Sequence, residues 1–216
     1  MNRKDPFVTN EYYHCYNRGV DKRVVFLDAQ DFDYFLTALE LFNREDSLGG
    51  MMEYSYPANR KLAESSKVEK LVNIYAFCLN PNHYHLLLQP NFDHGIQKYM
   101  QKVNTGYTMY FNKKYERSGS LFQGRYKSSH ISTDEYLKHI LAYISLNNEV
   151  HTGIDHQNYR SNLTSGGKYK KVFDPSLIRD LFDSTKKFES YARKKLPYMV
   201  EQKETLREIK DNFYIE

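Results

Sequence analysis

Residues 71–89, LVNIYAFCLNPNHYHLLLQ, decide the fold of this chain. Two apolar runs, residues 71–79 and 83–89, are separated by Asn80-Pro81-Asn82, whose residue types favour a tight turn. The pattern therefore predicts a β-hairpin. Because both runs are apolar at successive positions, we expect two central strands that helices cover on at least one side.

The segments on either side of the hairpin complete a repeating pattern. Residues 8–16 are rich in β-branched and aromatic side chains and predict a strand, and residues 124–131 predict another. Residues 28–43 and 93–112 repeat apolar side chains at helical spacing. Residues 46–69 lack periodicity and predict a long exposed loop. The order β-α-β-β-α-β predicts an α+β, ferredoxin-like split βαβ fold, an antiparallel sheet with helices on one face.

The last third of the chain is predicted to be mostly helical. Thr133 is placed to cap a helix that Asp134 and Glu135 open and that continues to Asn148. Beyond it the pattern predicts a loop at 151–171 and two helices, at 174–195 and 202–213. We therefore divide the chain into a domain at 1–150 and a helical C-terminal extension at 151–216.

Length and composition exclude several classes of protein. The chain has 216 residues, of which 40% are hydrophobic and 27% are charged. No apolar run approaches the roughly 18 residues that a membrane span needs, and the N-terminus has no secretory pattern. Two cysteines, Cys15 and Cys78, are too few for a disulfide scaffold or a four-thiolate zinc site, so we expect a cytoplasmic protein.

Positive charge is concentrated in one stretch. The net charge is +4, yet residues 91–131 alone carry seven Lys and Arg against two acidic residues. With 20 Tyr and 13 Phe in the chain, this stretch suits a surface that follows phosphates, while exposed rings stack on bases. A solvated helix face explains the same charges equally well.

His83 and His85 form the first candidate for chemistry. In a strand, side chains at i and i+2 lie on one face, so the two imidazoles can meet one cation, while Tyr84 faces the other way. Two ligands alone bind a metal weakly, and a chain with eight histidines can contain such a pair by chance. The pair needs a third ligand and a reactive group nearby.

The helix after Thr133 offers both groups. At about 100° per residue, Leu137 and Ile144 belong to a buried stripe, and His139, Tyr143 and Asn147 share a neighbouring one. A phenol and an amide oxygen thus lie one turn apart. A tyrosine without a catalytic role, whose ring is buried and whose hydroxyl is exposed to solvent, would show the same pattern.

Four short motifs match a known family. The chain resembles the HUH single-tyrosine transposases of the insertion-sequence-200 type, and more closely the REP-associated tyrosine transposases. The resemblance covers about residues 7–150, and the chain departs from the family pattern at Asn147-Asn148, where relatives commonly have Asn-Pro. It rests on YHCYNRG (13–19), NPNHYHLL (80–87), LFQGRY (121–126) and YISLN (143–147).

The resemblance implies a function and a role for each motif. It implies that Tyr143, on an extra helix, is the nucleophile, and that His83, His85 and Asn147 bind a divalent metal. The expected activity is metal-dependent nicking and strand transfer of single-stranded hairpin DNA through a 5′-phosphotyrosine intermediate. Two imidazoles favour zinc or manganese and the family implies magnesium or manganese, so we expect Mg²⁺ or Mn²⁺.

The expected partner is single-stranded or hairpin DNA. The predicted DNA-binding residues are Asn17, Arg18, Lys98, Lys102, Lys113, Lys114, Arg125 and Lys127. Family members act as dimers or as monomers, so a homodimer is allowed but not required. A non-catalytic nucleic-acid-binding module of ferredoxin-like fold is the alternative, and hydrolysis of a small phosphoester is a third, less favoured one because the chain has no Gly-rich phosphate loop.

Overall fold

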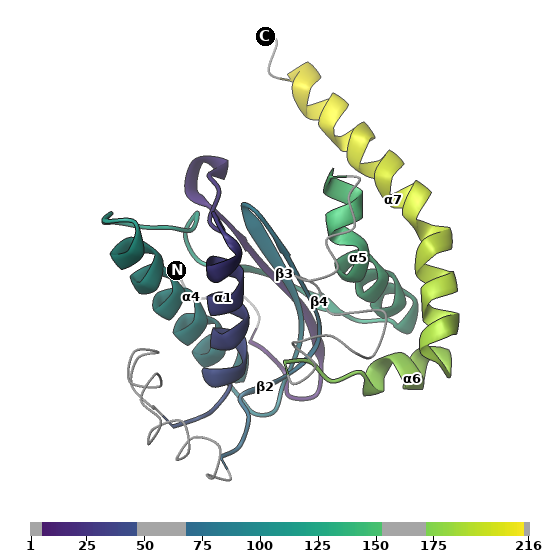
Figure 1. The fold of residues 1–216 in the computed structure, drawn as a ribbon. Helices are drawn as coiled ribbons and strands as arrows, with labels where there is room; N and C mark the ends of the chain where they lie inside the picture. Colours follow the sequence, from purple (N-terminus) through teal and green to yellow (C-terminus); the bar gives the residue numbers. More distant parts are fainter. Residues whose placement is uncertain (1–5, 47–67, 153–171, 214–216) are drawn as a thin grey trace.

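The computed structural model describes residues 6–46, 68–152 and 172–213. The predicted loops at 46–69 and 151–171 lie almost entirely outside these residues. A four-stranded antiparallel sheet has the order β2-β3-β1-β4, and helices cover both of its faces (Figure 1). The strands are β1 (Tyr12–Arg18), β2 (Val72–Asn80), β3 (His83–Pro90) and β4 (Lys127–Ile131). The helices are η1 (Val20–Lys22), α1 (Ala29–Leu41), α4 (Gly95–Lys114), α5 (Asp134–Thr152), α6 (Ser176–Phe182) and α7 (Thr185–Phe213).

The element order confirms the predicted α+β fold. From β1 to β4 it is β-α-β-β-α-β, with α1 and α4 together on one face of the sheet and α5 on the other (Figure 1). Asp28 caps α1 in a reciprocal box with Asp31, and Thr133 Oγ1 accepts the Tyr136 amide at the start of α5. Two β strands were expected at the centre, but β2 is an edge strand. Its residues are nonetheless mostly buried, because α4 and α5 pack over its two faces.

Several predicted boundaries were wrong. The first strand begins at Tyr12 rather than residue 8, because Val8 to Asn10 form a turn with Asn10 in the left-handed region (φ 66°). The last strand begins at Lys127 because Gly124, also left-handed (φ 80°), bends the chain away from β1.

The C-terminal helices also differ from the prediction. Asp183 adopts φ 61° and separates α6 from α7, which splits the helix expected at 174–195. A break was expected near Pro197, between the helices predicted at 174–195 and 202–213. Instead, α7 is continuous and includes Pro197. Proline removes one helical hydrogen bond, and packing of α7 along α5 offsets that loss.

Two apolar clusters hold the layers together. The larger joins the sheet to α1 and α4, and the smaller joins the opposite face to α5, α6 and α7. Gly106 lets α4 approach the end of α1, since a Cβ there would lie 2.5 Å from Phe42. Within the described residues, no helix is long and apolar enough to span a membrane.

Candidate active site

The alternation of β3 directs its first residues to opposite faces of the sheet. His83 and His85 face α5, with their ring centroids 5.1 Å apart. Tyr84 faces α1 instead, is fully buried, and has its ring 4.9 Å from that of Phe35. One strand therefore supplies both a core aromatic residue and two imidazoles on the opposite side.

Helix α5 brings Tyr143 and Asn147 over these imidazoles. The ring centroid of Tyr143 lies 5.6 Å from that of His85, and the two rings are nearly perpendicular. Asn147, one turn later, is fully buried, and its Oδ1 accepts a 2.7 Å hydrogen bond from Asn80 Nδ2. A phenol, two imidazoles and an amide thus meet between the sheet and α5, although they come from segments about 60 residues apart.

Neighbouring acceptors define which nitrogen of each imidazole is available. His83 Nδ1 lies 2.6 Å from Asn82 Oδ1, and His85 Nδ1 lies 2.8 Å from His14 Nε2. Asn82 Oδ1 can only accept, so His83 carries its proton on Nδ1 and presents a lone pair at Nε2. His14 Nε2, when it accepts from His85 Nδ1, leaves the Nε2 lone pair of His85 free in the same way.

The site keeps its imidazoles neutral. Burial lowers the pKa of His83 to about 3, with further lowering from His151 and Arg18. Burial also lowers the pKa of His14 to about 4, and that of His85 well below its usual value. Neutral imidazoles are the form that binds metals. For Tyr143 burial raises the pKa, so the phenol is protonated at neutral pH.

The donor atoms fit a divalent cation. His83 Nε2, His85 Nε2 and Asn147 Oδ1 are two neutral imidazoles and an amide oxygen, a set that suits Mn²⁺. Asn80 Oδ1 and Asn147 Nδ2 are buried and have no hydrogen-bond partner among the described residues, which is costly unless another group meets this cluster. In the part of the chain that is described, no three His, Cys, Asp or Glu side chains form a metal-binding group, so the candidate set depends on amides.

Positive side chains surround the outer end of this cluster. Arg18 ends β1 directly opposite His83, and its charge lowers the pKa of both His83 and His151. His151 lies on α5, and its ring centroid is 5.1 Å from that of His83. Lys203 of α7 donates to the carbonyls of Val150 and His151 at the end of α5. This rim suits an anion approaching the imidazoles.

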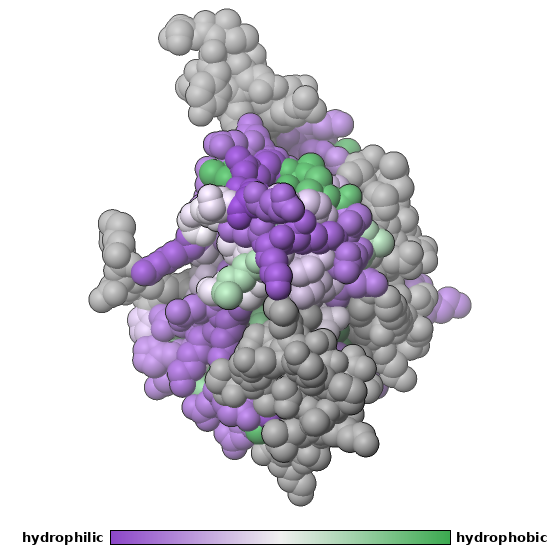
Figure 2. Space-filling view, turned by 60° about the vertical axis from the view of Figure 1, so that its left-hand side comes forward, coloured by the Kyte–Doolittle hydropathy of each residue, from purple (hydrophilic) through white to green (hydrophobic). Residues whose placement is uncertain are grey.

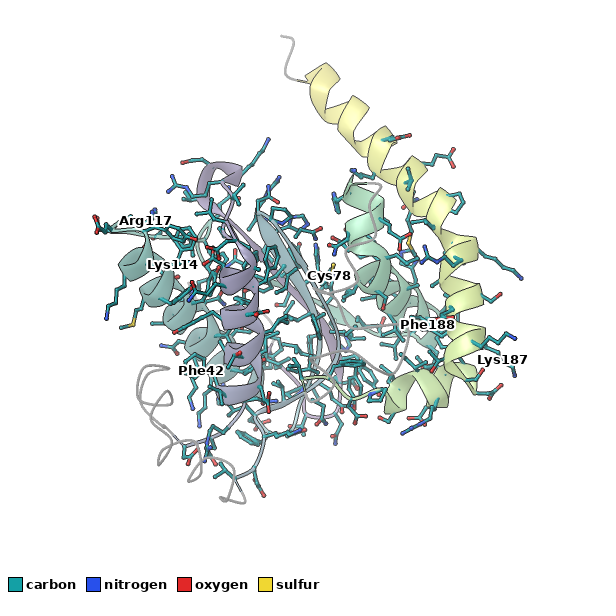
Figure 3. The ribbon with its side chains drawn as sticks, viewed as in Figure 1. Phe42, Cys78, Lys114, Arg117, Lys187 and Phe188 are labelled. Atoms are coloured by element: carbon teal, nitrogen blue, oxygen red, sulfur yellow. The ribbon has the colours of Figure 1, made fainter. Side chains whose placement is uncertain are left out.

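Three of the lysines predicted to bind DNA have partners inside the protein. Lys114 Nζ lies 2.7 Å from Asp28 and 2.8 Å from Asp31, at the end of α4 next to α1 (Figure 3). Lys102 Nζ donates to the carbonyls of Arg44, Glu45 and Asp46, and Lys98 Nζ lies 3.4 Å from a Glu45 oxygen. All three lie on α4, on the face of the sheet opposite to Tyr143. Lys113 is exposed at the same end of the helix.

The remaining predicted DNA-binding residues lie near β1 and β4. Asn17 is buried, and its Nδ2 donates to the Gly124 carbonyl at 3.2 Å, so it holds the bend before β4. Arg125 and Lys127 are exposed and line a groove of about 1190 Å³ between α4 and β4, which Tyr16 also borders. Figure 2, in which the side of the molecule that carries α4 comes forward, shows a mainly hydrophilic surface with small apolar patches.

Sequence reasoning missed several polar residues of the site. Asn80 was assigned only to a turn, and His14 and His151 were assigned no role. The signal for His151 was present, since it lies four residues after Asn147 and eight after Tyr143, but the helix was expected to end before it. Cys78 was also missed. It points from β2 towards α5 (Figure 3), and its Sγ lies 2.9 Å from Asn148 Oδ1.

Comparison with known proteins gives a match to one family model. Residues 53–147, which include both histidines, Tyr143 and Asn147, match the family model described as "Transposase IS200 like". Over these residues, the chain is similar to the IS200-like transposase family. This match supports the family resemblance predicted from the four motifs.

A search of solved structures gives a match to a protein described as a REP-associated tyrosine transposase bound to a REP hairpin. The match has a TM-score of 0.46 and 12% sequence identity, and it covers 71% of this chain and 76% of that chain. A comparison with curated proteins gives no match.

Proposed function

We propose that the protein is a metal-dependent enzyme that nicks single-stranded DNA and transfers the strand through a 5′-phosphotyrosine intermediate. The observation that carries this proposal is the 5.6 Å separation of the Tyr143 and His85 rings, with Asn147 and His83 beside them. A nucleic-acid-binding module needs no phenol over two neutral imidazoles. The preference for hairpin DNA rests on the sequence resemblance.

In this proposal Tyr143 is the nucleophile. Its Oη attacks the scissile phosphorus and forms a P–Oη bond, while the bond from phosphorus to the 3′ oxygen breaks. The phenolic proton leaves to solvent, and the leaving 3′ oxygen takes up a proton. The phosphoester bond is kept on the enzyme, so a second 3′-hydroxyl can attack it, release Tyr143 and rejoin DNA without ATP.

His83, His85 and Asn147 would hold the cation, Mg²⁺ or Mn²⁺. Such a cation withdraws charge from a phosphate oxygen and stabilises the developing alkoxide. The chain's own part is to hold both imidazoles neutral with Nε2 facing α5, which Asn82 and His14 support through Nδ1. Helix α5 then sets the position of Tyr143 relative to those nitrogens.

Arg18, Lys113, Arg125 and Lys127 are the predicted DNA-binding residues that we propose as phosphate contacts. All four are exposed, and Arg18 ends its strand opposite His83. Asn17 supports this surface from within through Gly124. We further propose that residues 1–150 form the catalytic domain, with 151–216 as an extension whose helix α7 braces α5.

Adduct formation tests the proposal. The protein is incubated with a single-stranded hairpin DNA and Mn²⁺, and products that survive denaturation are resolved by electrophoresis. We expect a covalent protein–DNA adduct that Tyr143→Phe abolishes. Tyr136→Phe is the matched control, because Tyr136 lies on the same helix and is 40% exposed. An adduct that persists in Tyr143→Phe would show that another group is the nucleophile.

A further inference from the structure

Asn80 is a polar residue of the site to which neither the family resemblance nor the proposed mechanism assigns a role. It ends β2 directly opposite His83 and is 2% exposed. Its Nδ2 donates to Asn147 Oδ1 at 2.7 Å and lies 3.1 Å from His83 Nε2. Its own Oδ1 is buried without a hydrogen-bond partner among the described residues.

Besides a long contact to Cys78 Sγ at 4.0 Å, Asn80 Nδ2 meets two atoms, and each of them offers a lone pair. Because His83 carries its proton on Nδ1, where Asn82 accepts it, the Nε2 atom can only accept. Asn147 Oδ1 is a carbonyl-type acceptor. A single NH₂ group thus satisfies the two lone pairs that the proposed function assigns to the cation.

We propose that Asn80 is an additional ligand of this cation and binds it through Oδ1. The inference rests on the proposed function and deepens it. A half-turn of the carboxamide about its last bond exchanges Nδ2 and Oδ1 without changing the space that the group fills. With Oδ1 turned inward, three lone pairs face one point, and a cation is required to hold them together.

The distances suit such a ligand set. Donor atoms in neighbouring positions of an octahedron, each roughly 2.1 Å from Mg²⁺, are about 3.0 Å apart. The 2.7 and 3.1 Å contacts of Asn80 Nδ2 lie on either side of that value. Two imidazole nitrogens and two amide oxygens would leave two of six positions for a phosphate oxygen and water.

A purely structural role for Asn80 is the competing explanation. It accounts for the hydrogen bonds of Nδ2 but leaves the buried Oδ1 without a partner among the described residues, at a cost of about 1–3 kcal/mol for a polar group of this kind. As a ligand, Asn80 gains the cation as a partner for Oδ1, in exchange for the hydrogen bonds that Nδ2 makes to His83 and Asn147.

Calorimetric titration of the full chain with Mn²⁺, without DNA, tests the inference. We expect one binding event that His83→Ala removes. Asn80→Leu should weaken Mn²⁺ binding by about 10- to 100-fold. Asn80→Asp, which supplies a charged oxygen at the same place, should strengthen it by roughly 10-fold or more at pH 7.5. Asn73→Leu is the matched control, since Asn73 lies on the same strand and contacts Gln89 and Asn91, away from the site.

A spectroscopic measurement covers the case in which Asn80→Leu fails to fold. In ¹H–¹⁵N spectra, the side-chain NH₂ pair that disappears in Asn80→Asp should shift strongly on saturation with Mg²⁺, as the amide turns. An unchanged NH₂ pair, together with wild-type Mn²⁺ affinity in Asn80→Asp, would overturn the inference and leave the proposed function standing. A wild-type chain that shows no His83-dependent Mn²⁺ binding would overturn the metal dependence itself.

Discussion

The buried polar groups on the two faces of the sheet differ in whether they have hydrogen-bond partners. Towards α1 and α4, the hydroxyls of three buried tyrosines all have acceptors: Tyr84 donates to Asn104, Tyr99 to Leu39 and Tyr107 to Val25. Towards α5, Asn80 Oδ1 and Asn147 Nδ2 lack partners in the part of the chain that the structure describes, and four imidazoles lie close to one another on the same face. Polar atoms on the first face serve the fold, and those on the second are the ones that we propose to bind a cation.

The largest difference between the faces should appear in activity. His83→Ala removes a proposed cation ligand and should lower the rate of adduct formation on the order of 10³-fold, since cation stabilisation of this kind contributes several kcal/mol. Tyr84→Phe changes the adjacent residue on the other face and loses the hydrogen bond of its hydroxyl to Asn104. It should keep the rate within a few-fold. Equal losses in both variants, measured as initial rates, would remove the distinction between the faces.

A lysine of the α4 face should affect stability more than DNA binding. Asp31 is fully buried, and Lys114 is its cationic partner. Lys114→Met leaves that carboxylate without a counter-ion, which we expect to cost roughly 3 kcal/mol of unfolding free energy in a urea titration. Lys113→Met, at the exposed position directly before Lys114, should change the free energy of unfolding by less than about 0.5 kcal/mol. A stable Lys114→Met protein with weakened DNA binding would restore the original prediction for this residue.

Acid should lower the free energy of unfolding through a buried histidine on the α5 face, His14. The pKa of His14 is about 4 in the folded protein, because burial opposes its charged form, and near 6.5 when unfolded. The unfolded chain therefore binds a proton that the folded chain does not, and stability falls as pH decreases from about 6.5 to 4. At about 1.4 kcal/mol per pH unit, this residue alone contributes roughly 3 kcal/mol.

His14→Gln, which keeps an acceptor for His85 but cannot ionise, isolates that contribution. Unfolding free energies at pH 7.5 and 4.5 should differ less in this variant than in wild type, by an amount close to the value for one histidine. Carboxylates elsewhere affect both proteins equally. The same pH dependence in both proteins would mean that His14 is not neutral in the fold.

Local patterns were sufficient to predict the fold but only part of the site. The hairpin, the helix cap at Asp28 and the element order follow from periodicity and turn residues close together in the sequence. His83 and His85 could be placed on one face because strand alternation is a local rule. The partners of these histidines come from three other segments, so Asn80, His14 and His151 became visible only when the strands were paired and α5 was placed.

The roles of the charged side chains were equally difficult to predict from local sequence. The concentration of lysines at residues 98–114 is evident in the sequence, but their partners Asp28, Asp31 and Glu45 come from about 50 to 90 residues earlier. A count of charges along the chain cannot distinguish a lysine that neutralises a buried carboxylate from one that faces solvent. The helix through Pro197 was missed for a related reason, since its packing along α5 is a tertiary effect.

The central claim is that the α5 face is a reaction centre whose nucleophile is Tyr143. Mass spectrometry of the adduct, digested by protease and nuclease, tests it directly, because a chain with 20 tyrosines offers many other attachment points. We predict that the nucleotide remnant is attached to Tyr143 through a 5′-phosphate. A remnant on Tyr16, Tyr136 or any other residue, with Tyr143 unmodified, would contradict the account.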